Sequence, residues 1–147
     1  MEGECLSSGQ TLSDMVHRVL PIGSWVVDFL FAKLDYDDEG VLACLYEMDA
    51  DYEVMRQVNK IMDSDKLNCG FTFANPDLKR ALVVVGPSSS GKQFVNTLVH
   101  EVHHLAVAIA DSLGHDLESE VPAYLSGDAA MALAETVCEF GCSHCRD

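Results

Sequence analysis

The sequence of 147 residues predicts a small α+β domain. Short apolar or alternating runs bounded by turn residues indicate strands, and apolar residues at intervals of three and four indicate helices that follow them. The hydrophobic content of 48% is enough for a core without disulfide support. The six cysteines are scattered along the chain and do not have the spacing of a disulfide framework. We therefore expect one domain over residues 13–147, after a polar and disordered segment at residues 1–12.

The first half of the chain predicts a strand followed by helices. Residues 15–20 read as a strand, which Pro21 and Gly23 end. The apolar segment 25–33 is compatible with a strand or a helix, because its apolar residues are nearly continuous. Leu45, Met48 and Tyr52 lie among apolar residues at helical intervals, so residues 41–62 indicate one broken helix or two.

The second half predicts a hairpin followed by two helices. Residues 69–74 alternate as a strand, Asn75-Pro76-Asp77 is a turn, and residues 81–85 return as the partner strand. A long helix is expected from the cap at Ser90 to the stop at Leu113-Gly114. A closing helix is expected after Glu120.

The long helix carries the motif His100-Glu101-Val102-His103-His104, which is HExxH. Positions i and i+4 of a helix lie on one face, so His100 and His104 can hold one metal ion while Glu101 points into the adjoining space. Neutral imidazole suits zinc, and a third ligand and a water complete a catalytically open site. The motif thus indicates metal-assisted hydrolysis. Since the helix is apolar nearly all round, we expect it to be buried.

The third ligand must come from elsewhere in the chain. Ala110 stands where a metzincin has its third histidine, which excludes that class. Residues 88–127 resemble the gluzincin-like zincins, particularly their small single-domain members, in which the glutamate of an E-x-x-A pattern on the following helix completes the site. Glu120 with Ala123 matches this pattern. Glu118 and Asp111 are the alternatives.

This resemblance implies a zincin-like domain whose antiparallel or mixed sheet packs on the HExxH helix and on a following helix that bears a ligand. It implies a zinc metallopeptidase in which Glu101 is the general base on a water that the metal activates. An edge strand would hold an extended peptide substrate. The alternative is a non-catalytic zinc-binding structural or interaction protein, for example one associated with a phage or a mobile element.

Two other motifs compete with HExxH. Residues 86–92 satisfy the G-x-x-x-x-G-K pattern of a phosphate-binding loop, but Gln93 replaces the hydroxyl residue that holds magnesium. Too few residues follow for an NTPase fold, so we expect a strand-to-helix turn there. Near the end of the chain, Cys138, Cys142 and Cys145 are compatible with free thiols, a disulfide or a second metal site.

The net charge of the chain limits the classes of partner that the protein is expected to bind. A net charge of −15, from 9 basic and 24 acidic residues, argues against nucleic acid and anionic membranes and favours basic peptides. No apolar run is long enough to span a bilayer, and the acidic N-terminus does not resemble a signal peptide. We therefore expect a cytoplasmic protein. The oligomeric state is not predicted.

Overall fold

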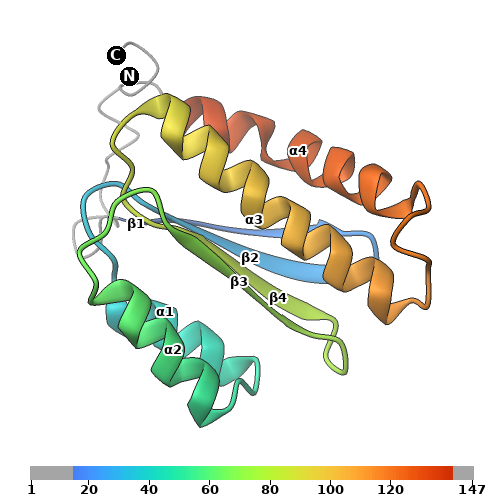
Figure 1. Ribbon diagram of the computed structural model, residues 1–147, viewed down its shortest axis with the longest axis horizontal. Coiled ribbons are helices and arrows are strands. Elements are labelled where there is room, and N and C mark those ends of the chain that lie inside the picture. The colour runs from blue at the N-terminus through green and yellow to red at the C-terminus, as the bar shows by residue number, and fades with distance from the viewer. Residues whose placement is uncertain (1–14, 141–147) are drawn as a thin grey trace.

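The computed structural model describes residues 15–140 (Figure 1). The segment predicted to be disordered, and Cys142 and Cys145, lie outside the described residues. Within them, a four-stranded mixed sheet lies between two pairs of helices, one pair on each face. The protein is thus an α+β domain of three layers.

The sheet is built from two hairpins joined by a parallel pair of strands. β1 (Met15–Ile22) and β2 (Trp25–Ala32) pair antiparallel, as do β3 (Gly70–Asn75) and β4 (Arg80–Val85). β2 and β4 lie side by side and parallel, so the strand order is β1-β2-β4-β3. This arrangement leaves β1 and β3 at the two edges of the sheet.

The helices cover the sheet in pairs. α1 (Asp38–Glu47) and α2 (Tyr52–Met62) connect β2 to β3 across one face, which settles the region predicted as one helix or two. α3 (Gly91–Ser112) and α4 (Val121–Phe140) form a hairpin on the other face (Figure 1). A crossover through helices is what a parallel strand pair requires.

The boundaries of α3 follow the predicted signals. The Ser90 hydroxyl accepts a hydrogen bond from the amide of Gln93 at 3.2 Å, as expected of an N-cap. After Leu113, Gly114 has a φ of +78°, a conformation that glycine adopts without strain. Residues 86–90 connect β4 directly to α3 without a further helix or strand, in agreement with the strand-to-helix connection predicted there.

Each face of the sheet has its own hydrophobic core, because successive strand residues point to opposite faces. The core beneath α3 and α4 contains Phe31 of β2, in ring contact with Phe94 of α3 and Phe140 of α4. The core beneath α1 and α2 contains Leu30 of β2 and Leu45 of α1. β2 is thus covered on both faces, which explains why its sequence is apolar apart from Asp28.

The prediction that α3 is buried all round is wrong. His100, His103 and His104 are exposed, as are Val95 and Val99. The helix packs on the sheet and on α4, and its remaining surface faces solvent. Among residues 15–140, no helix combines the length and the apolar character that a bilayer crossing requires.

Candidate metal centre

The two histidines of the HExxH motif lie together on the exposed side of α3. Their Nε2 atoms are 3.1 Å apart, and their ring centroids are 4.7 Å apart at an interplanar angle of 80°. This proximity follows from their spacing of one helical turn. The structure therefore brings His100 and His104 together as the sequence predicts.

The separation of the two nitrogens is close to what a shared zinc ion requires. Zinc–nitrogen bonds of about 2.0–2.1 Å in tetrahedral geometry set two ligand nitrogens roughly 3.3 Å apart. The observed 3.1 Å also suits a hydrogen bond in which one imidazole donates and the other accepts. The donor set of His100 and His104 thus fits zinc with little rearrangement.

Glu101 points away from solvent, toward the edge strand β3. Its side chain is buried, with a relative exposure of 4%, and Oε1 accepts a hydrogen bond from the hydroxyl of Thr72 at 2.8 Å. The same hydroxyl lies 3.1 Å from the carbonyl oxygen of Glu101. Since a hydroxyl carries a single proton, it serves one of these two acceptors at a time. The carboxylate is therefore oriented by the edge strand.

A pocket of about 320 Å³ lies beside the motif, between α3 and the beginning of β3. Both His100 and Glu101 line it. Within the described part of the sheet, β3 pairs with β4 alone, so its outer edge is not covered by another strand. The pocket is completed by residues before and at the start of β3 and by the first half of α3: Asn68, Cys69, Gly70, Asn96 and Thr97.

Gly70 permits the close packing of β3 against α3. A Cβ atom there would lie 2.6 Å from the backbone oxygen of Val84 and 3.1 Å from the Cγ of Glu101. We expect Gly70→Ala to lower the free energy of unfolding by about 1–3 kcal/mol, as overpacking does, and chemical denaturation will measure it. Gly127→Ala is the control, because its Cβ would meet nothing within 4 Å on α4. Equal stability of the two variants would contradict this account of Gly70.

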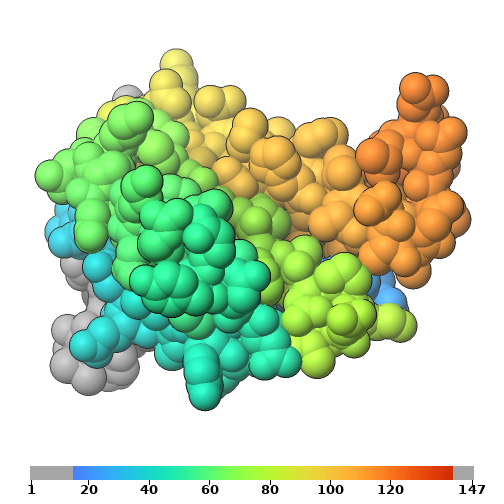
Figure 2. Space-filling view, turned by 60° about the horizontal axis from the view of Figure 1, so that its bottom comes forward, coloured from blue at the N-terminus to red at the C-terminus, as the bar shows by residue number. Residues whose placement is uncertain are grey.

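The predicted third ligand lies elsewhere. Glu120 is exposed in the connection that precedes α4, while α3 continues to Ser112 beyond His104. At 1.5 Å per residue, this extension places the connection about 12 Å along the helix axis from His104. Figure 2 shows the connection, in orange, projecting at one end of the molecule.

The structure does not gather the predicted ligand set. Among the described residues, the one group of three metal-ligating side chains with ligand atoms within 4.8 Å of one another is His17, Asp28 and Cys44. The predicted third ligand, Glu120, therefore does not join the two histidines of α3. Neither do the alternatives, Glu118 and Asp111. The sequence predicts where α3 ends, but not the path of the connection between α3 and α4, which decides where Glu120 lies.

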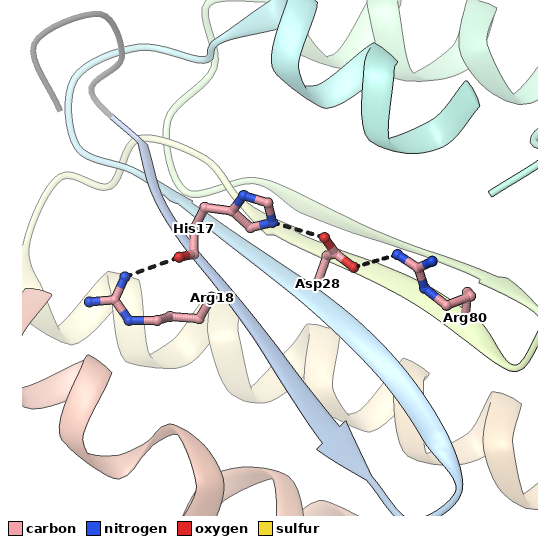
Figure 3. A network of polar contacts seen from close by, with 4 residues as sticks. All are labelled: His17, Arg18, Asp28 and Arg80. Atoms are coloured by element: carbon pink, nitrogen blue, oxygen red, sulfur yellow. Dashed lines mark hydrogen bonds and ion pairs between the residues drawn. The ribbon is translucent and has the colours of Figure 1, made fainter. Parts of the chain in front are cut away.

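The unpredicted group lies on the opposite face of the sheet (Figure 3). Asp28 of β2 is buried, at 5% exposure, and its two carboxylate oxygens have different partners. The Nε2 of His17 lies 2.8 Å from Oδ2, and Nη2 of Arg80 donates to Oδ1 at 2.9 Å. His17 comes from β1 and Arg80 from β4, so three adjacent strands form this network.

Cys44 of α1 lies beside the same carboxylate. Burial, and then the negative charges of Asp28 and Glu47, raise the pKa of its thiol to about 11. The thiol is therefore protonated at neutral pH, which argues against a cysteine nucleophile. No sequence motif predicts this group, because its members come from three separate elements.

No family model matches the chain, and comparisons with curated proteins and with solved structures found no match either. A functional proposal therefore depends on the geometry and chemistry of the two groups of side chains.

Proposed function

We propose that the protein is a zinc-dependent metallopeptidase-like hydrolase, in which His100 and His104 bind the metal and Glu101 is the general base. The observation that carries this proposal is the 3.1 Å separation of the two Nε2 atoms beside a pocket that Glu101 lines. A zinc ion held there would supply Lewis-acid chemistry, which polarises a peptide carbonyl and acidifies water.

The side chains around the pocket have distinct roles in this proposal. The carboxylate of Glu101 takes a proton from the attacking water and delivers it to the leaving amine. Thr72 holds one oxygen of that carboxylate, at 2.8 Å, so the side chain keeps its direction. The outer edge of β3 binds an extended peptide by backbone hydrogen bonds. The substrate class is thus a peptide or protein segment.

The candidates for the third ligand differ in how much the chain must rearrange for each of them to reach the metal. Asp111 lies two turns beyond His104 on α3 and is exposed. Glu120 would require the connection before α4 to fold back along α3 when the metal binds. Glu120 remains our candidate from the sequence pattern, and substitution of each carboxylate decides between them.

One alternative has its own support. The Oε1 of Glu101 already accepts from Thr72, and a third ligand does not lie beside His100 and His104. A structural or interaction protein that binds zinc without turnover would show the same arrangement. Zinc binding without hydrolysis of any peptide in a diverse library would favour this alternative.

Zinc content tests the metal site directly. We expect His104→Ala to lose one zinc ion per chain relative to the wild type, because one imidazole alone cannot hold the ion. Elemental analysis of dialysed protein will measure the loss. His103→Ala is the matched control, since His103 is also exposed on α3 but lines an apolar groove toward α4.

Unchanged zinc content in His104→Ala would overturn the proposed site. Loss of zinc in Glu120→Ala would assign that residue as the third ligand, and loss in Asp111→Ala would assign the aspartate instead. Hydrolysis of a fluorogenic peptide by the wild type, lost in His104→Ala and kept in His103→Ala, would establish the activity.

A further inference from the structure

His17, Asp28 and Cys44 form a compact group on the face of the sheet that α1 and α2 cover. Each offers one ligand atom, and the three atoms lie within 4.8 Å of one another. The residues come from β1, β2 and α1. α3 and its histidines lie on the other face of the sheet, so this group is independent of the HExxH motif.

The three ligand types select the class of cation. A nitrogen, a carboxylate oxygen and a sulfur suit zinc, which accepts all three. Calcium and magnesium prefer oxygen ligands alone and do not select a thiol. Three ligands from the protein also leave a fourth position for water, and His17 lies at the surface with 47% of its side chain exposed.

Arg80 prepares the carboxylate for this role. It donates to Oδ1 of Asp28 at 2.9 Å, so Oδ2 is the oxygen that faces His17. A hydrogen bond to the second oxygen of a ligating carboxylate fixes its direction and favours coordination through one oxygen. The positive charge of Arg80 also offsets the negative charge of Asp28, which is almost fully buried.

The rearrangement required is small. Zinc bonds of about 2.0–2.3 Å in tetrahedral geometry hold N, O and S ligand atoms roughly 3.3–3.6 Å apart. The Nε2 of His17 and Oδ2 of Asp28 are 2.8 Å apart and would have to separate slightly. The remaining separations are at most 4.8 Å and would have to close. Side-chain rotations achieve changes of this size without movement of the strands.

We propose that His17, Asp28 and Cys44 bind a zinc ion that ties α1 to the sheet. Binding forms a zinc–sulfur bond and releases the thiol proton of Cys44 to solvent. The imidazole coordinates through Nε2 once its proton is on the other ring nitrogen or in solvent. The ion replaces the direct contact between His17 and Asp28 by a bridge that includes the helix. This site goes beyond the proposed peptidase centre and does not depend on it.

The number of zinc ions bound per chain tests the site when it is measured in a variant, called the background chain, that lacks other candidate metal ligands. In a chain that carries His104→Ala, and serine in place of Cys138, Cys142 and Cys145, we expect one zinc ion per chain. Addition of Cys44→Ser should remove it, and addition of Cys69→Ser should not. Because Cys69 is also a partly buried free cysteine, it is the matched control.

The absorption spectrum of bound cobalt(II) is a second measurement. Cys44→Ser changes this spectrum only if Cys44 is a ligand of the metal. In the same background, cobalt should produce a near-ultraviolet thiolate-to-metal absorption band, lost in Cys44→Ser and weakened in His17→Ala. Zinc should also raise the melting temperature of the background chain and not that of the Cys44→Ser chain. Circular dichroism will confirm that each variant is folded.

Two results would overturn the proposal: a background chain that binds no zinc, or one whose zinc and cobalt band survive both Cys44→Ser and His17→Ala. These outcomes are distinct from failure of the peptidase centre, which is read from His104→Ala in the chain that keeps Cys44.

Discussion

Glu101→Gln is expected to reduce peptide hydrolysis by a factor of about 100 or more while zinc content stays unchanged. The amide of glutamine cannot accept a proton from water, so the general base is lost. Glutamine has nearly the same shape as glutamate, and its amide oxygen can still accept the hydrogen bond from Thr72. The change therefore removes the chemistry and leaves the packing of α3 against β3. Steady-state kinetics with a fluorogenic peptide will measure it as a fall in kcat/KM.

Glu135→Gln is the control for this prediction. Glu135 is exposed on α4, and its substitution removes the same charge from the chain as Glu101→Gln does. We expect its kcat/KM to match that of the wild type. A Glu101→Gln variant with wild-type kinetics would show that another group accepts the proton. A parallel fall in zinc content would instead give Glu101 a role in binding the metal.

Phe31→Ala is expected to lower the free energy of unfolding by about 3–5 kcal/mol. Phe31 is completely buried, and its ring lies 5.3 Å from that of Phe94 and 5.6 Å from that of Phe140. One side chain thus connects the sheet to both α3 and α4. Small domains have total stabilities of about 5–15 kcal/mol, so this loss is a large fraction of the whole. Urea denaturation will measure it.

Phe31→Leu separates the loss of volume from the loss of the ring. Leucine keeps most of the buried apolar surface, so we expect a smaller cost than for alanine, of about 1–2 kcal/mol. If alanine at this position costs less than leucine, or costs nothing, the aromatic cluster does not hold the two helices on the sheet.

The local features of the fold could be predicted from sequence. The hairpin of β3 and β4 follows from two strand runs around the turn at Asn75-Pro76-Asp77, and the start of α3 follows from the cap at Ser90. These signals act over a few residues, so they are readable without knowledge of the rest of the chain.

The long-range features could not be predicted in the same way. β2 is covered on both faces, so its sequence lacks the alternation that distinguishes a strand from a helix. Its parallel pairing with β4 depends on how α1 and α2 cross the sheet, which no local pattern specifies. The exposure of His100 and His104 was missed because apolar residues also lie on the solvent side of α3, for example Val99.

The same distinction applies to the candidate sites. The proximity of His100 and His104 is a consequence of helix geometry and was predicted from their spacing. The position of Glu120 depends on the path of the connection between α3 and α4, and the group around Asp28 depends on strand pairing and on the packing of α1. The spacing of these residues along the chain contains neither kind of information.

The pocket beside His100 has two walls that differ in stiffness. The helical wall is anchored by buried residues along α3, whereas the other wall is β3, which is bonded on one side only. Detaching an outermost strand breaks one ladder of hydrogen bonds, and detaching a central strand breaks two. The pocket therefore adjusts its shape more readily at β3 than at α3, where His100 and His104 keep their mutual geometry.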